Sequence, residues 1–317
     1  MISSVVVSTG ARIHAGLLVE PAGQFRSVGW MIDQPGFLLE VQRQPQGDDA
    51  LACGGWTGRL RELLAQYRQR RSLPAVRVQL RQEIPPHVGL GSGTQLTMAV
   101  GAALSQLQCE PLDLCAWAKG CQRARRSNVG MIGFLQGGCV LLDEQASLPE
   151  NWRFVLLRPR REQGLHGTRE QAAFAQMAAM PQTLRSELSR LVQYEMSGAL
   201  RDRDAWRFGA ALQQFNTLVG AYFAPWQGGL FADRRLSALA ASGAWGGCGM
   251  AQSSWGPSVI IVAADEDHAQ TILQQAHRHP ISEEYTVQCV RGLNHGATVC
   301  LKSTPSPVNG SSSCPQS

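Results

Sequence analysis

The segment at residues 75–107 constrains the fold most, because a glycine-rich turn stands there between a strand pattern and a helix pattern. Residues 75–81 alternate apolar and polar side chains, and the pattern stops at Pro85 and Pro86, which cannot continue a ladder of hydrogen bonds. Residues 89–94 read Gly-Leu-Gly-Ser-Gly-Thr, and residues 95–107 are rich in Ala, Leu and Met. This composition favours a helix. The sequence therefore predicts a strand, a tight turn and a helix in that order.

The turn has the composition of an anion site. Its glycines let the backbone approach a ligand closely, and the helix that follows points free N–H groups and its positive dipole end at the turn. Ser92 and Thr94 add hydroxyl donors, so the pattern predicts a phosphate site. Neither the Gly-Lys-Ser/Thr of a Walker A loop nor the Gly-x-Gly-x-x-Gly spacing of dinucleotide-binding turns is present. A tight turn without a ligand is the alternative.

Composition narrows the class of protein. The 317 residues suit one large domain or two fused ones, and the net charge of +5 does not call for nucleic acid. Only two of the 29 basic residues are Lys. Arginine forks suit phosphate and carboxylate groups, although a GC-rich genome would explain the bulk of them equally well.

Cysteine usage and hydropathy bear on location. The nine cysteines show neither a CxxC pair nor zinc-ligand spacing, so we interpret them as free thiols in a reducing compartment. No secretory signal opens the chain, and no run of about 18 apolar residues predicts a membrane span. We expect a cytoplasmic protein that does not engage a membrane.

Periodicity predicts the remaining elements. Strands are expected at residues 5–7 and 13–19, on either side of Gly10, and at 36–41, 152–158, 258–263 and 284–291. Helices are expected at residues 57–70, 113–123, 184–199, 205–223, 234–241 and 266–279. Residues 130–142 are interpreted as a glycine-rich turn that feeds a strand. We place a boundary after residue 146, which gives lobes at 1–146 and 147–302, and we expect a disordered tail at 303–317.

The fuller string around the turn resembles the phosphate-binding motif of the GHMP kinases, which include galactokinase, homoserine kinase and mevalonate kinase. In that motif Pro-x-x-x-Gly-Leu-Gly-Ser-Ser heads a long helix. Here Pro85 holds the proline position, Gly93 stands where the second Ser is usual, and Thr94 follows. The resemblance implies a two-lobed α+β fold, with an N-terminal lobe like ribosomal protein S5 and a C-terminal α+β lobe.

A closer resemblance covers nearly the whole chain and is to the β-ribofuranosylaminobenzene 5′-phosphate synthase family. Five segments carry it in order: residues 12–17 (Arg-Ile-His-Ala-Gly-Leu), 29–35 (Gly-Trp-Met-Ile-Asp-Gln-Pro), 91–96 (Gly-Ser-Gly-Thr-Gln-Leu), 125–138 and 252–257 (Gln-Ser-Ser-Trp-Gly-Pro). Ala15 replaces the family's usual Phe, and Asn128 and Val129 depart from the expected small residue and Ile before Gly130. None of these changes removes a polar group of the motifs.

The resemblance implies a decarboxylating pentosyltransferase of tetrahydromethanopterin synthesis and one-carbon metabolism. Such an enzyme transfers ribose 5-phosphate from phosphoribosyl diphosphate to 4-aminobenzoate or 4-hydroxybenzoate and releases diphosphate and carbon dioxide. It uses no nucleotide, and Mg²⁺ would bridge the diphosphate oxygens. The expected partners are thus small molecules. The sequence leaves the oligomeric state open, a homodimer included.

Candidate site residues follow from the motifs. The diphosphate is assigned to the turn residues Gly89, Gly91, Ser92, Gly93 and Thr94. Arg125 and Arg126 are candidates to grip phosphate or benzoate, with a solvated basic run as the alternative. Asp33 is a candidate for Mg²⁺ or the ribose hydroxyls, or a turn-forming residue near Pro35.

Two further groups complete the candidate site. Arg12 and His14 alternate with Ile13, so both side chains face one way on a strand, where His14 is either functional or a satisfied core histidine. Gln252, Ser253 and Ser254 are expected in a loop near the phosphate turn, with Trp255 stacking on the arene or packing in the core. We count Asp33, Arg126, His14 and Arg12 as catalytic candidates.

Two other functions stay open on the sequence. An ATP-dependent small-molecule kinase of the same fold would need a phosphoryl acceptor and usually a magnesium-binding carboxylate, and Gly93 in place of the second Ser weakens that reading. A non-catalytic binding protein could use the same scaffold, because a fold alone does not prove activity.

Overall fold

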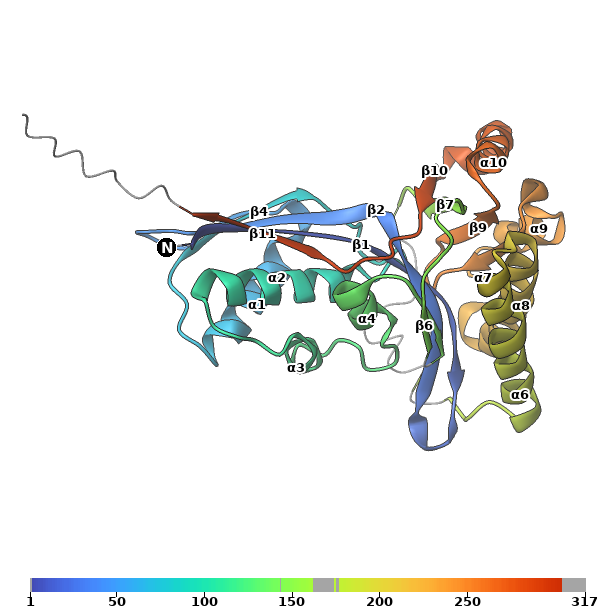
Figure 1. The fold of residues 1–317 in the computed structure, drawn as a ribbon, viewed down its shortest axis with the longest axis horizontal. Coiled ribbons are helices and arrows are strands. Elements are labelled where there is room, and N and C mark those ends of the chain that lie inside the picture. Colours follow the sequence, from blue (N-terminus) through green and yellow to red (C-terminus); the bar gives the residue numbers. More distant parts are fainter. Residues whose placement is uncertain (1, 143, 162–173, 175–176, 304–317) are drawn as a thin grey trace, which may run out of the picture.

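The structure is a computed structural model that describes residues 2–142, 144–161, 174 and 177–303. Its strands form two sheets that lie side by side, each with its own set of helices (Figure 1). The predicted α+β class is therefore confirmed. Among the described residues, no helix is both long enough and apolar enough to cross a bilayer.

The first sheet has the order β11-β1-β2-β4-β3, with β5 paired to β2 and β6 paired to β5. Its strands are β1 (Ile2–Val19), β2 (Phe25–Arg43), β3 (Ala50–Ala52), β4 (Val76–Gln82), β5 (Cys139–Leu142), β6 (Glu144–Ala146) and β11 (Thr298–Ser303). Helices α1 (Thr57–Arg68), α2 (Ser92–Gln108), α3 (Leu114–Gly120) and α4 (Val129–Gln136) lie on one side of it (Figure 1). Helix α2 contacts both β1 and β2, which makes it the central helix of this lobe.

Strand β1 is continuous, so the prediction of two strands separated near Gly10 is wrong. Gly10 pairs with Gly36 of β2 inside the ladder. A Cβ atom at Gly10 would lie 2.0 Å from the carbonyl oxygen of Ile32, so this glycine permits a close backbone approach within the strand. The far ends of β1 and β2 bend out of the sheet and run toward helix α6 (Figure 1).

Helix α4 replaces most of the turn that was expected at residues 130–142. Its glycines serve packing: a Cβ atom at Gly130 would lie 3.2 Å from the side chain of Thr94, and one at Gly133 would lie 2.4 Å from the sulfur of Met31. Tertiary contact therefore overrides the low helix propensity of glycine. The strand expected after it is present as β5.

The second sheet has the order β10-β7-β9-β8. Its strands are β7 (Arg153–Pro159), β8 (Gly249–Gln252), β9 (Val259–Ala263) and β10 (Tyr285–Arg291). Helices α6 (Gln182–Arg190), α7 (Ser197–Asp202), α8 (Ala205–Gln227), α9 (Arg234–Ala241) and α10 (Glu266–Arg278) accompany it. Short 3₁₀ turns lie at η1 (Pro21–Gly23), η2 (Gly54–Trp56), η4 (Ala244–Gly246) and η5 (Pro280–Glu283). The helices predicted from periodicity are confirmed here within a few residues at each end.

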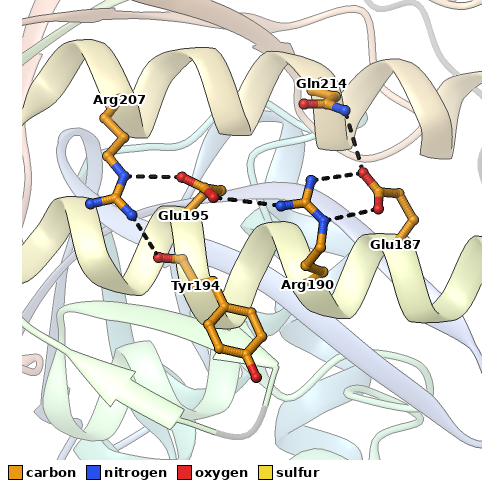
Figure 2. Close-up of polar contacts among 6 residues, drawn as sticks. All are labelled: Glu187, Arg190, Tyr194, Glu195, Arg207 and Gln214. Carbon is orange, nitrogen blue, oxygen red and sulfur yellow. Dashed lines mark hydrogen bonds and ion pairs between the residues drawn. The ribbon is translucent and has the colours of Figure 1, made fainter.

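Helices α6 and α7 are joined by a π-helical turn, η3 (Leu191–Met196), and this segment packs against α8. Polar contacts tie the two together on the outer face (Figure 2). Arg190 pairs with Glu187 at 2.9 Å and with Glu195 at 3.5 Å, and Arg207 of α8 pairs with Glu195 at 3.0 Å. This helix pair forms the wall against which the bent end of β1 packs.

The C-terminal strand β11 returns to the first sheet and pairs with β1. The proposed boundary after residue 146 thus separates the strands of the two sheets, apart from β11. Of the tail expected at residues 303–317, only Ser303, the last residue of β11, lies within the described residues.

Candidate functional site

The glycine turn lies where the sequence predicts it, between β4 and α2. Gly89 and Gly91 both have left-handed backbones, with φ values of +85° and +72°. Gly91 is the N-cap of α2, and its carbonyl accepts hydrogen bonds from the amides of Thr94 and Gln95 at 3.1 and 3.2 Å. The first N–H groups of a helix have no carbonyl partner within it, so the start of α2 has the geometry that binds anions.

The turn rests on the loop that follows β8. A Cβ atom at Gly89 would lie 2.4 Å from the carbonyl oxygen of Ser253, so glycine is needed there for both conformation and space. The hydroxyl of Ser253 donates to the carbonyl of Gly89 at 2.7 Å and accepts from the amide of His14 at 3.0 Å. The amide of Ser254 donates to the carbonyl of His14 at 2.7 Å. Three segments distant in sequence are thereby fixed to one another.

A cavity of about 250 Å³ opens beside this junction. Four arginines line it, and no Asp or Glu does so among the described residues; the arginines are Arg12, Arg123, Arg125 and Arg126. Three aromatic residues also line it and form an aromatic wall, in which the ring of Trp255 lies 5.2 Å from that of Phe174 and 5.3 Å from that of Phe223. The cavity thus combines four arginines with a cluster of aromatic rings, which suits an anion that carries or accompanies an aromatic ring.

His14 faces this cavity as a neutral, buried group. Its side chain and that of Arg12 both line the cavity, as the alternation along the strand predicts. Only 4% of His14 is exposed, and neither ring nitrogen has a hydrogen-bond partner among the described residues. Burial, and secondarily the Arg12 guanidinium, hold the pKa of His14 well below its usual range. A buried polar group without a partner is costly, and a hydrogen bond to a ligand in the cavity would remove that cost.

Arg125 and Arg126 lie on the loop between α3 and α4. Both line the cavity, which favours the binding interpretation over a solvated basic run. The guanidinium carbon of Arg126 stands 4.0 Å from the ring centroid of Phe174, at the distance of a cation–π contact. Arg126 therefore joins the basic side of the cavity to its aromatic wall.

The loop that bears these arginines also presents Arg123, which the sequence did not single out. A Cβ atom at Gly93, in the first turn of α2, would lie 2.9 Å from a terminal nitrogen of Arg123. The guanidinium therefore rests on the helix start. The signal was present as the run Arg123-Ala124-Arg125-Arg126, but periodicity assigned Arg123 to the end of a helix.

Gln252 and Asn216 tie the cavity wall together. Gln252 ends strand β8, so the expectation that it lies in a loop is wrong. Its side chain accepts from the amide of Ala232 at 2.6 Å and donates to the carbonyl of Ser254 at 2.9 Å. Asn216 of α8, which the sequence did not indicate, donates to the carbonyl of Ala15 at 2.7 Å and accepts from the amide of Gln252 at 3.0 Å. Both residues hold β1 and β8 in place.

The remaining candidates lie at different distances from the cavity. Thr94 and Ser254 line it, and Ser92 is buried in the first turn of α2. Asp33 is not part of the lining; one of its carboxylate oxygens accepts from the amide of Arg291 at 2.9 Å, near the end of β10. Within the described part of the chain, no group of three or more His, Cys, Asp or Glu residues is arranged to hold a metal ion.

Comparison with known proteins supports the predicted GHMP-type α+β fold. The family model for the GHMP kinases N terminal domain matches residues 58–137, and the one for the GHMP kinases C terminal matches residues 196–281. The chain belongs to the GHMP superfamily. Mevalonate diphosphate decarboxylase from Staphylococcus aureus matches with a TM-score of 0.68 at 13% identity, over 95% of this chain and 98% of that one. Homoserine kinase from Cytophaga hutchinsonii matches with a TM-score of 0.57 at 18% identity, over the same shares.

Three curated relatives that the chain resembles are β-ribofuranosylphenol 5′-phosphate synthases. The relative from Methanothermobacter thermautotrophicus is 24% identical over 308 residues, which covers 84% of this chain and 91% of the relative. The relative from Archaeoglobus fulgidus is 30% identical over 155 residues, which covers 42% of this chain and 49% of the relative. The glycine turn lies inside the first matched GHMP segment and residues 252–255 inside the second, whereas Arg12 and His14 precede both.

Proposed function

We propose that this enzyme is a β-ribofuranosylaminobenzene or β-ribofuranosylphenol 5′-phosphate synthase. It would transfer ribose 5-phosphate from phosphoribosyl diphosphate to 4-aminobenzoate or 4-hydroxybenzoate, releasing carbon dioxide and diphosphate. The proposed pathway is tetrahydromethanopterin synthesis, which serves one-carbon transfer. The names of the curated relatives, which specify the phenol, support this class of reaction.

The observation that carries the proposal is the pairing of a cationic end and an aromatic wall in one cavity. The start of α2, with Arg123 upon it, suits a diphosphate, and the wall formed by Phe174, Phe223 and Trp255 suits a planar ring. Arg126 lines the same cavity and lies over the ring of Phe174. Both substrates of the proposed reaction are anions, which matches a described lining with four arginines and no carboxylate.

The charges of the site fit the proposed bond changes. When the bond between C1 of the ribose and the diphosphate oxygen breaks, its electron pair stays on the diphosphate. The helix N-terminus and the guanidinium groups of Arg12 and Arg123 would stabilise that charge as it develops. The sugar is left with oxocarbenium character, which the electron-rich arene then attacks.

The second half of the reaction needs no base at the ring. The ring carbon that bears the carboxylate bonds to C1 of the ribose, and the bond to the carboxylate carbon then returns its electron pair to the ring as carbon dioxide leaves. No ring proton is removed, and the described lining accordingly offers no carboxylate base. His14, held neutral by burial, would orient the substrates through its ring nitrogens.

Mg²⁺ has no protein ligand set among the described lining residues, since oxygen ligands such as Asp or Glu are lacking there and Asp33 lies outside the cavity. We therefore derive no step through a magnesium ion held by the protein. The magnesium proposed for this reaction would arrive with the diphosphate of the substrate.

A cytoplasmic location is part of the proposal. The eight cysteines among the described residues are all free thiols, which fits a reducing compartment.

The test mixes purified enzyme with phosphoribosyl diphosphate, magnesium and either 4-aminobenzoate or 4-hydroxybenzoate labelled at the carboxyl carbon. We expect release of labelled carbon dioxide that depends on both substrates and not on ATP, and the faster of the two acceptors identifies the natural one. Formation of diphosphate without release of labelled carbon dioxide would contradict the proposal that either benzoate is the acceptor.

The kinase alternative gives a different outcome in the same assay. A GHMP kinase would hydrolyse or transfer phosphate from ATP to a small alcohol and would leave the label in the benzoate. Turnover of ATP without decarboxylation would support the kinase alternative. Homoserine kinase from Cytophaga hutchinsonii is a kinase that shares this fold.

A further inference from the structure

Two glycines at the start of α2, the N-cap Gly91 and Gly93 in the first turn, each make room for one arginine. A Cβ atom at Gly91 would lie 3.2 Å from the side chain of Arg12. A Cβ atom at Gly93 would lie 2.9 Å from one terminal nitrogen of Arg123 and 3.0 Å from its guanidinium carbon. The guanidinium of Arg123 thus fills the space that a side chain at position 93 would take. It is a positive group that rests on the positive end of a helix, and an anion bound at that end would stabilise both.

The backbone around Arg123 is shaped to present it. Gln122 and Ala124 both have left-handed backbones, with φ values of +62° and +55°, although neither is glycine. The amide of Arg123 donates to the carbonyl of Ala118 at 2.8 Å, which anchors the turn to the end of α3. Such conformations persist where the surroundings fix them, and they gather at functional sites.

A second observation points independently to a ligand in the same place. His14 lines this cavity with 4% of its surface exposed and with no hydrogen-bond partner at either ring nitrogen among the described residues. A buried imidazole of this kind is satisfied when a ligand enters. The cavity therefore suits a partly polar molecule next to the helix start.

We propose that Gly93 and Arg123 form a specificity pair for a diphosphate. The missing side chain at position 93 admits the guanidinium, and the guanidinium binds the diphosphate oxygens with its forked N–H groups. The hydroxyl side chain that GHMP kinases usually carry at the position of Gly93 would displace Arg123. Glycine at position 93, where GHMP kinases usually carry serine, thus allows an arginine to neutralise the bound anion. That the diphosphate belongs to a phosphoribosyl donor rests on the proposed function, whereas the anion site does not.

The test is a mutant cycle read by calorimetric titration with inorganic diphosphate in the absence of magnesium. The variants are Arg123→Gln, Gly93→Ser, their combination and, as a matched loss of one positive charge, Arg201→Gln on the exposed face of α7. We expect Arg123→Gln to weaken binding about 10- to 100-fold, as for a lost charge-assisted hydrogen bond. Gly93→Ser should weaken it about 5-fold or more in the native background, and by less than about twofold when Arg123 is already Gln.

Thermal unfolding of each variant checks the fold. Gly93→Ser should keep its melting temperature, because the atom it meets is the mobile end of a long side chain. If Arg123→Gln does not fold, Arg123→Lys replaces it, and a loss of diphosphate affinity is again expected because lysine lacks the fork. Diphosphate affinity in the Arg123 variant equal to that in Arg201→Gln would overturn the proposal, as would fully additive losses in the double variant.

The two proposals fail separately. Coupling between Gly93 and Arg123 in the cycle, without release of labelled carbon dioxide by the native enzyme, would support the diphosphate-binding pair and contradict the proposed reaction. Release of labelled carbon dioxide without coupling in the cycle would support the proposed reaction and contradict the role of Gly93 and Arg123 as a pair.

Discussion

The cavity and the outer face of helices α6 and α8 both gather arginines, but their neighbours differ. On the helix face, Arg190 and Arg207 contact Glu187 and Glu195, and the charges alternate along the surface (Figure 2). Around the cavity, four arginines converge and no carboxylate lines the described part. Exposed ion pairs of the first kind add little to stability, because water already solvates both partners. Positive charge gathered in a concave site is arranged to attract and orient an anion.

The comparison predicts its largest effect at Arg126. We expect Arg126→Gln to lower kcat/KM of the proposed decarboxylating reaction about 100-fold, because the proposed site would lose a charge that is placed to contact the substrate. The melting temperature should stay within about 2 °C of the native one. Steady-state kinetics and calorimetry measure both. A loss no greater than that of the exposed Arg201→Gln would remove Arg126 from the site.

A smaller effect is expected from His14, seen in the pH dependence of stability. Because burial lowers the pKa of His14 in the folded state, the unfolded chain binds its proton first as pH falls below about 6.5. The native protein should therefore lose about 1.4 kcal/mol of unfolding free energy per pH unit from this group, down to its folded pKa. His14→Gln should lack this slope.

Denaturant titrations between pH 7.5 and pH 5 measure the difference. The gap in unfolding free energy between the native protein and His14→Gln should shift in favour of the variant as pH falls. A gap that stays constant over this range would mean that His14 is not buried as a neutral group.

Asp33 tests the boundary of the cavity. Its carboxylate accepts a hydrogen bond from the amide of Arg291 and lies outside the lining. Asp33→Asn should therefore keep turnover within about threefold and cost about 1 kcal/mol of stability, the size of one weakened hydrogen bond. A loss of turnover comparable to that of Arg126→Gln, with the fold intact, would restore the hypothesis that Asp33 is catalytic.

The smallest effect belongs to the paired arginines of the helix face. Arg190→Gln should leave kcat/KM unchanged and shift the melting temperature by less than about 2 °C, because its partners are exposed and remain solvated. Parallel melting curves at low and high salt would show the native and variant proteins converging as salt screens the pair. A large loss of activity here would erase the distinction between the two regions.

Local patterns predicted the elements that local physics decides. The helices expected at residues 57–70, 113–123 and 234–241 follow from neighbouring residues, and the structure confirms them as α1, α3 and α9. The glycine turn was predictable for the same reason, since its glycines and the helix after it lie together in the sequence. Arg12 and His14 were placed on one face by simple alternation.

Elements that depend on contacts between residues distant in sequence were not predicted. Strand β11 exists because it pairs with β1 from the other end of the chain. Helix α4 forms despite its glycines because they fit against Thr94 and Met31. Arg123 was missed for the same reason, since its relation to Gly93 appears only when the loop after α3 folds back over α2. Nothing in the spacing of these residues indicates that approach.

The most direct measurement is a crystal structure of the enzyme with phosphoribosyl diphosphate and a benzoate bound. We expect the diphosphate at the start of α2, within hydrogen-bond distance of the Gly93 amide and the Arg123 guanidinium, and the benzoate ring against Phe174 and Trp255. Diphosphate bound away from α2, or a benzoate ring outside the aromatic wall, would contradict the proposed site.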